Sequence, residues 1–311
     1  LGAGLRREGH DVVEMPLADG GEGTLDVLGG PNRSTVVTGP LGDPVEAGWR
    51  LSRRVAVIEM ARASGLDLVG GADGNDAVAA STWGTGELIT DAMEHAAKQV
   101  IVTVGGSATT DGGLGALRAM YPLQRLKGVE LVVACDVSIG FLEAPSLFGP
   151  QKGATDAQVE LLERRLERLA DVYLEEHGVD VRDIAGSGAA GGLAGGLAAV
   201  GAELVSGFDL VAEHVGLDEA LEEVDAVVTG EGFLDAESFD GKVVGGVMDV
   251  AAAAGKPVVA VVGQAFDDAA GRIATVSLAD EFGLEEALAD AGACLFDSAR
   301  AVAGRLEAER A

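Results

Sequence analysis

Glycine-rich segments carry most of the residues whose types could do chemistry. Several of them, including residues 18–24, 104–113 and 229–232, come directly after short runs rich in Val or Ile. Glycine lets backbone N–H groups approach a ligand closely, and N–H groups where a strand leads into a helix bind anions. The pattern therefore predicts anion-binding loops at the carboxyl ends of strands.

The segment Val104–Gly113 combines glycines, hydroxyls and one carboxylate. We expect the backbone of Gly105 and Gly106, with Ser107 and Thr109, to cradle a phosphate. Asp111 could coordinate Mg²⁺ or accept a proton from an attacking hydroxyl. The segment is not a Walker A sequence, because no Gly-Lys-Ser/Thr ends it, and the chain has no GxGxxG motif.

Lys152 lies between glycines in Phe148–Ala154 of an otherwise acidic protein. This placement favours a ligand for phosphate or carboxylate oxygens. The competing interpretation is a simple helix entry with Thr155 as the N-cap. The later segment Gly186–Gly192, which contains Gly188, could wrap a pyrophosphate or could let a helix pack closely; both readings stay open.

Two acidic segments could hold a metal or orient a hydroxyl. Asp19 and Glu22 lie in the first of these segments, which taken alone is better interpreted as an acidic tight turn that caps a helix at Thr24. Glu231 and Asp235 follow a predicted strand and are candidate Mg²⁺ ligands, with Lys242 as a candidate phosphate clamp. The alternative is that Asp235 and Lys242 only cap and pair locally.

Composition limits the classes of partner. The 311 residues include 51 Asp and Glu against 22 Lys and Arg, a formal charge of −29, which disfavours nucleic acid and anionic membranes as partners. The acidity could serve solubility or adaptation to high salt. No uninterrupted apolar run is long enough for a membrane span, no signal peptide opens the chain, and the two cysteines have no metal-like spacing. We therefore expect a cytoplasmic protein.

Alternation of buried strands and amphipathic helices predicts an α/β fold with a parallel sheet. Residues 35–59 instead alternate in short segments broken by Gly and Pro, which predicts antiparallel hairpins in a second subdomain. Residues 1–9 resemble a helix tail with no strand before it, so we expect sequence upstream. The expected strands are Val12–Leu17, Val55–Met60, Val100–Val104, Leu131–Cys135, Ala226–Val228 and Pro257–Val262; the expected helices are Gly86–Lys98, Asp156–Glu176, Gly241–Ala254, Leu284–Ala291 and Ser298–Glu309.

Taken in order, these segments resemble the type-I glycerate kinase family. The matching stretches span nearly the whole chain: Leu17–Thr24, Thr38–Pro44, Ala56–Leu66, Ser81–Ile89, Gly105–Gly113, Ala134–Val137, Phe148–Thr155, Gly188–Gly192 and Thr229–Lys242. The chain departs from the family pattern in lacking an opening strand with an Asp-Ser-Phe-Lys loop and in being short between Arg118 and Val129. It also has Ser138-Ile139-Gly140 where Asn-Pro-Leu is common, Phe233 where an arginine is usual, and Glu237-Ser238 where Gln-Thr is usual.

The resemblance implies phosphorylation of D-glycerate by ATP and Mg²⁺, with 2-phosphoglycerate or 3-phosphoglycerate as product. It implies two α/β domains, one Rossmann- or flavodoxin-like and one inserted with a mixed sheet, and an active site in the cleft between them. We place the first domain at residues 1–34 plus 205–311 and the second at 35–204. ATP and D-glycerate are the expected partners, with a homodimer as an option. Two alternatives stay open: a non-catalytic nucleotide- or anion-binding protein, and a kinase of another small sugar acid.

Applied to the matching positions, the resemblance assigns roles to individual residues. Asp111, Asp136 and Lys152 are the expected catalytic residues. Asp19, Glu22 and Lys152 are expected to bind the substrate, and Gly105, Gly106, Ser107, Thr109, Gly188 and Lys242 to bind phosphate or nucleotide. Glu231 and Asp235 are expected to hold the metal, although base and metal roles among the carboxylates are not separated.

Overall fold

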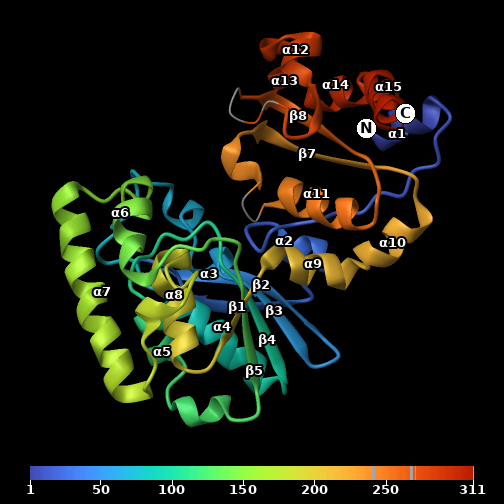
Figure 1. Cartoon of the computed structure of the whole chain (residues 1–311). Coiled ribbons are helices and arrows are strands. Elements are labelled where there is room, and N and C mark those ends of the chain that lie inside the picture. The colour runs from blue at the N-terminus through green and yellow to red at the C-terminus, as the bar shows by residue number, and fades with distance from the viewer. Residues whose placement is uncertain (240–241, 267–268, 270, 311) are drawn as a thin grey trace. The chain divides into compact units, whose positions relative to one another are not determined.

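The computed structural model describes residues 1–239, 242–266, 269 and 271–310, without the side chains of residues 237 and 310. The chain forms two compact units (Figure 1). The central unit comprises residues 18–211 and contains a mixed sheet. The terminal unit comprises residues 1–17 and 212–311 and contains a separate parallel sheet. The predicted α/β fold class, with one mixed and one parallel sheet, is confirmed.

The sheet of the central unit has six strands in the order β1-β2-β3-β4-β5-β6. The strands are β1 (Arg33–Thr38), β2 (Pro44–Ser52), β3 (Val55–Glu59), β4 (Gln99–Thr103), β5 (Glu130–Ala134) and β6 (Glu203–Val205). The first three are antiparallel, as the alternation in residues 35–59 predicts, and β3 to β6 are parallel. The Val- and Ile-rich runs of β3, β4 and β5 are buried, which is typical of strands covered on both faces.

The helices of the central unit cover this sheet and complete its core. They are α2 (Thr24–Val27), α3 (Ala61–Ser64), α4 (Trp83–Glu94), α5 (Leu114–Ala119), α6 (Ala144–Phe148), α7 (Asp156–His177) and α8 (Ala189–Ala199), with 3₁₀ turns η1 (Asp67–Val69), η2 (Leu123–Leu126), η3 (Phe141–Glu143), η4 (Pro150–Lys152) and η5 (Val181–Asp183). Helix α4 packs against β1 and β3, and α8 packs against β5 and β6. Helix α7 starts in a capping box between Thr155 and Gln158, so the predicted Thr155 N-cap is confirmed.

The terminal unit has three parallel strands, β7 (Val227–Leu234), β8 (Val258–Ala265) and β9 (Ala274–Ser277). Val259 and Val261 of β8 belong to an apolar cluster with α1 and α15, whereas Ala260 and Val262 cluster with Val244 of α11. The helices are α1 (Gly2–Arg7), α10 (Leu217–Glu223), α11 (Val243–Ala253), α12 (Leu278–Phe282), α13 (Leu284–Ala289), α14 (Ala291–Asp297) and α15 (Ala299–Arg310), and α9 (Gly207–Val215) runs across the boundary of the two units.

Some expectations about elements are wrong. Val12–Leu17 forms no strand: Val13 is 65% exposed, and Pro16 has no N–H to donate to a ladder. The predicted helix Leu284–Ala291 is two helices, because Asp290 caps the start of α14. The predicted helix Gly241–Ala254 corresponds to α11, and Gly241 lies outside the described residues. The predicted domain boundaries stay a prediction, and residues 18–34 and 205–211 belong here to the central unit.

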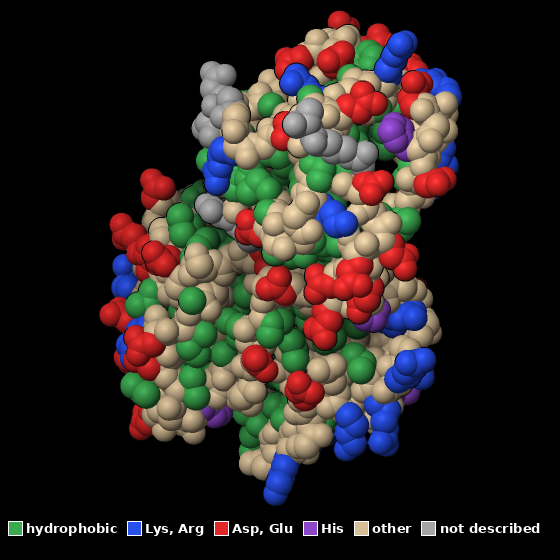
Figure 2. Space-filling view, turned by 45° about the vertical axis from the view of Figure 1, so that its right-hand side comes forward, with side chains coloured by type: hydrophobic (Ala, Val, Ile, Leu, Met, Phe, Trp, Pro, Cys, Tyr) green, Lys and Arg blue, Asp and Glu red, His purple; other side chains and the backbone are tan. Residues whose placement is uncertain are grey.

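The surface is strongly acidic, as the composition requires. Figure 2 shows Asp and Glu side chains scattered over the visible face. Within the part of the chain that the structure describes, no helix combines the length and the hydropathy that a membrane crossing needs.

Candidate functional site

The carboxyl ends of the parallel strands in the central unit are covered by loops that pack closely together. A Cβ atom at Gly105 would lie 2.7 Å from the Cα of Gly21, and one at Gly106 would lie 1.4 Å from a carboxylate oxygen of Glu22. A Cβ atom at Gly207, just after β6, would lie 2.2 Å from the backbone oxygen of Asp19. The turn that carries Asp19 and Glu22 is therefore pressed against the loops that follow β4 and β6. Gly105 and Gly207 face backbone atoms of this turn, so a larger residue would not fit at these two positions.

The loop after β4 presents a row of backbone donors. Within the described residues, the N–H groups of Gly105, Gly106 and Ser107 have no hydrogen-bond partner. The loop itself is fixed, because Leu66 N–H donates to the Gly106 carbonyl at 2.8 Å and Ala108 N–H donates to the Ser64 carbonyl at 3.0 Å. Unpaired N–H groups on a fixed backbone have the geometry that suits an anion, and we call Gly105, Gly106 and Ser107 the candidate anion cradle.

Lys152 lies beside this cradle and is 3% exposed. Its Nζ donates to Ser107 Oγ and to the Thr109 carbonyl, both at 2.7 Å. Burial lowers the pKa of Lys152 to about 7, although the charge of Asp111 acts in the opposite direction. Asn75 Nδ2 anchors the segment by donating to the carbonyls of Lys152 and Ala108, both at 2.9 Å. The two sequence interpretations of this segment are compatible, since Thr155 caps α7 while Lys152 contacts the cradle.

Asp111 is held in a dense set of hydrogen bonds. Its carboxylate accepts from the backbone N–H and the hydroxyl of Thr82, both at 2.9 Å, and from Ser81 Oγ at 3.3 Å. It also accepts from the N–H groups of Gly113 at 3.0 Å and Gly115 at 3.1 Å. These contacts anchor the loop after β4 to the starts of α4 and α5.

The glycine-rich start of α8 packs against the same loop. Ala190, Gly191 and Gly192 all have left-handed backbone angles, with φ of 51°, 66° and 88°. A Cβ atom at Gly191 would lie 2.0 Å from the Thr109 carbonyl oxygen, and one at Gly188 would lie 2.3 Å from the Gly140 carbonyl oxygen. Of the two readings of this segment, the geometry supports close packing.

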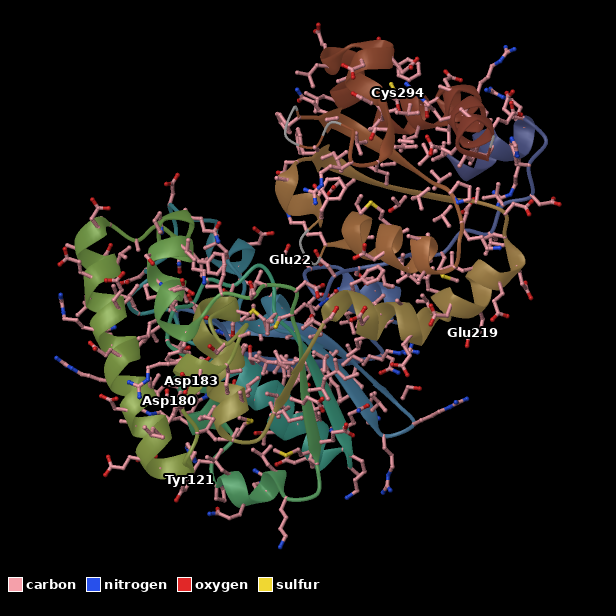
Figure 3. All side chains as sticks on the ribbon, viewed as in Figure 1. Glu22, Tyr121, Asp180, Asp183, Glu219 and Cys294 are labelled. Atoms are coloured by element: carbon pink, nitrogen blue, oxygen red, sulfur yellow. The ribbon has the colours of Figure 1, made fainter. Side chains whose placement is uncertain are left out.

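Asp136 and Glu22 are carboxyl groups with raised pKa values. Asp136 accepts from the N–H groups of Gly207 at 2.8 Å and Phe208 at 2.9 Å. Burial nevertheless raises the pKa of Asp136 to about 6, and the charge of Asp19 adds to the effect. Glu22 (labelled in Figure 3) has a raised pKa because of its burial and the nearby charges of Asp67 and Glu59. A carboxyl with a pKa of about 6, as Asp136 has, suits proton transfer.

Glu59 at the end of β3 is a site residue that the sequence interpretation missed. It is 5% exposed, and its Oε2 accepts from the N–H groups of Gly23 and Leu25, both at 3.1 Å. Arg62 Nε lies 3.5 Å from the other carboxylate oxygen. Glu59 thus fixes the turn that carries Glu22. The available signal was a glutamate ending the apolar run of β3, with an arginine three residues later.

The remaining predicted residues belong to the terminal unit. Glu231 lies in β7, and its Oε1 is buried without a hydrogen-bond partner among the described residues. Asp235 follows β7 and accepts from the backbone N–H of Ser238 at 3.1 Å and from its hydroxyl at 3.2 Å. Lys242 immediately precedes α11. The described residues contain no group of three or more His, Cys, Asp or Glu side chains arranged to hold a metal ion.

The central unit is thus an α/β unit with a fixed loop of unpaired N–H groups, a buried lysine and two carboxyl groups with raised pKa values. Comparison with known proteins identifies the class. The sequence profile described as "Glycerate kinase family" matches residues 1–121 and 122–307. The chain belongs to the glycerate kinase family.

Individual relatives agree with this assignment. "Glycerate 2-kinase" of Escherichia coli is 40% identical over 294 residues, which covers 82% of this chain and 77% of the relative. "Glycerate kinase" of Halalkalibacterium halodurans is 40% identical over 287 residues, covering 80% of this chain and 75% of the relative. The crystal structure of putative glycerate kinase 2 from Salmonella typhimurium superposes with a TM-score of 0.79 at 34% identity and covers 99% of this chain and 92% of that one.

Proposed function

We propose that the protein transfers a phosphoryl group from ATP to D-glycerate in an Mg²⁺-dependent reaction, giving 2-phosphoglycerate or 3-phosphoglycerate. The observation that carries the proposal is the anion cradle of Gly105, Gly106 and Ser107 with Lys152 beside it. Membership of the glycerate kinase family supports the reaction class, and the name of the E. coli relative favours 2-phosphoglycerate. The cytoplasmic location and a homodimer stay predictions.

Direct in-line transfer without a phosphoenzyme fits these residues. The N–H groups of Gly105, Gly106 and Ser107 would bind phosphate or carboxylate oxygens, and Lys152 would neutralise charge through its contact with Ser107 Oγ at 2.7 Å. Such chemistry depends on positioning and on charge neutralisation more than on a covalent nucleophile.

The carboxylates divide into two sets in this proposal. We assign the proton-accepting role to Asp136, whose pKa of about 6 lets it be ionised at neutral pH yet still take up a proton. Asp19 and Glu22 would bind the glycerate hydroxyls. Asp111, with five hydrogen-bond donors on its carboxylate, would hold the loop rather than touch the substrate.

The orphaned Oε1 of Glu231, a buried oxygen in need of a cation or a donor, supports a magnesium ion in the terminal unit. The described residues supply no cluster of three carboxylates, so water and phosphate oxygens would complete the coordination, as is usual for magnesium. Glu231 and Asp235 would hold the ion, and Lys242 would bind phosphate. When bound, magnesium neutralises charge on the transferring phosphates.

The test is glycerate-dependent ADP formation by the purified protein, with other small sugar acids assayed beside glycerate and the product identified by NMR. We expect activity with D-glycerate, its loss in Lys152→Ala, and its retention in Lys98→Ala, which removes an exposed lysine of the same unit. ADP formation that does not depend on glycerate, or that is faster with another sugar acid, would remove the proposed substrate.

A further inference from the structure

Two phenylalanines form an exposed stacked pair in the terminal unit. Phe233 lies in β7 and Phe266 directly follows β8, and their ring centroids are 6.2 Å apart with 25° between the planes. Phe233 is 55% exposed and Phe266 is 43% exposed. Among the described residues they are the exposed phenylalanines, and exposing two large aromatic rings side by side forgoes the burial that usually stabilises them.

The pair lies where ligands bind in this kind of sheet. Strands β7 and β8 are parallel, Phe233 pairs with Gln264 in the register, and Phe266 N–H donates to the Leu234 carbonyl at 2.9 Å. Both rings are therefore at the carboxyl ends of neighbouring parallel strands, which is the binding edge of open α/β sheets. Backbone pairing keeps the two residues side by side without help from a ligand.

Residues next to the pair point to a nucleotide. Glu231, two positions before Phe233 on the same strand, has the buried oxygen without a partner. Side chains two positions apart on a strand point to the same face, so Glu231 and Phe233 lie on one face of β7. A flat apolar surface beside a candidate cation ligand combines the features that bind the base and the phosphates of a nucleotide.

We propose that Phe233 and Phe266 form a stacking platform for the purine base of the nucleotide. The proposal rests on the proposed function, in which ATP is the phosphoryl donor. Stacked bases lie about 3.4 Å apart, so a base between the two rings would need about 7 Å from ring to ring. The ring centroids are 6.2 Å apart, so the base stacks on an outer face of the pair. Stacking also suits a chain with a charge of −29, since it provides affinity without relying on attraction of the anion.

The test compares ATP with inorganic tripolyphosphate, which has the phosphates and no base, by titration calorimetry on the full chain. Phe233→Leu and Phe266→Leu keep an apolar side chain but remove the flat ring. We expect each to weaken ATP binding about 5- to 100-fold and to leave tripolyphosphate binding unchanged. Phe233→Trp, which keeps a ring, should retain ATP affinity. Leu288→Ala, at a residue 70% exposed on α13, is the matched control and should change neither affinity.

The outcomes separate this proposal from the proposed function. If the wild type phosphorylates glycerate with ATP and the two leucine variants bind ATP as tightly as the wild type, the platform is refuted and the kinase stands. An equal loss of affinity for ATP and for tripolyphosphate also refutes the platform. A leucine variant with an altered sedimentation coefficient or melting temperature and unchanged ATP affinity refutes it as well, because the pair would then be a packing surface. A wild type that binds no ATP overturns both.

Discussion

Replacing Lys152 by methionine tests how the anion cradle works. Methionine keeps an unbranched apolar stem in the buried position but removes the ammonium group and its contacts with Ser107 and the Thr109 carbonyl. If the positive charge is present for the ligand rather than for folding, the variant should lose activity and stay folded. We expect kcat/KM for ATP-dependent glycerate phosphorylation to fall at least about 100-fold, the effect typical of removing one preorganised donor.

The difference in the free energy of unfolding between the wild type and Lys152→Met should depend on pH in a defined direction. Burial lowers the pKa of Lys152 from 10.5 to about 7. Between these values the unfolded chain binds a proton at this site that the folded chain does not, so the free energy of unfolding of the wild type rises with pH. Below about pH 7 the folded protein must bury the charge, and the full penalty is present. The advantage of the wild type over Lys152→Met should therefore increase by about 2.5 kcal/mol from pH 6 to pH 9.

The assay is urea denaturation of the wild type and Lys152→Met at pH 6, 7, 8 and 9. Subtracting the two free energies of unfolding at each pH cancels the contribution of groups that titrate alike in both proteins. Lys98→Met is the matched control: Lys98 is exposed, so the same chemical change should leave the difference flat with pH. A difference between wild type and Lys152→Met that falls as pH rises, or stays flat, would refute the reasoning about the buried ammonium. A fully active Lys152→Met would remove this lysine from the site.

Other predictions follow from single contacts. Glu59→Ala frees the turn that carries Glu22 and should raise KM for glycerate about tenfold. Glu59→Gln keeps an acceptor oxygen, so its KM should lie between those of the wild type and Glu59→Ala. The same KM in both variants and the wild type would contradict the positioning role. Urea denaturation of two glycine variants of α8 tests the strain at Ala190. Ala190→Gly should leave the free energy of unfolding within about 0.5 kcal/mol of the wild type, because relief of the left-handed backbone offsets the lost methyl group. Ala194→Gly, at a helical position, should lower the free energy of unfolding by about 1–2 kcal/mol. Raising the KCl concentration should increase the melting temperature, because salt screens the self-repulsion of a chain with a formal charge of −29. The expected rise is about 2–4 °C for each kcal/mol of repulsion screened. A melting temperature that falls would contradict adaptation to high salt.

The sequence predicts the strands best where Val and Ile form short buried runs. The buried strands β3, β4 and β5 follow from their Val- and Ile-rich composition, and the hairpins of β1 and β2 follow from alternation and turn residues. Val12–Leu17 has a similar composition but forms no strand, because strand formation needs a neighbouring ladder, which local composition does not reveal.

The candidate site was predicted in its residue types more than in its contacts. The glycines at 105 and 106 were recognised as a close-approach loop, but the sequence could not show that their partners would be Gly21 and Glu22, more than eighty residues earlier. Asp111 has the type of a catalytic carboxylate, and only the structure reveals the donors that surround it. Glu59 was missed because a single charged residue ending a strand is usually solvated.

The central claim is that the loop after β4 binds an anionic group of the reactants with the help of Lys152. Binding of inorganic phosphate or tripolyphosphate, followed by the ¹⁵N chemical shifts of the Gly105, Gly106 and Ser107 amides in wild type and Lys152→Met, measures this directly. We predict saturable shifts at these three amides in the wild type and a loss of affinity of about tenfold or more in the variant. If these amides do not move, the anion cradle does not exist and the kinase proposal loses its support. If they move equally in both proteins, Lys152 takes no part in binding the anion and the central claim is contradicted.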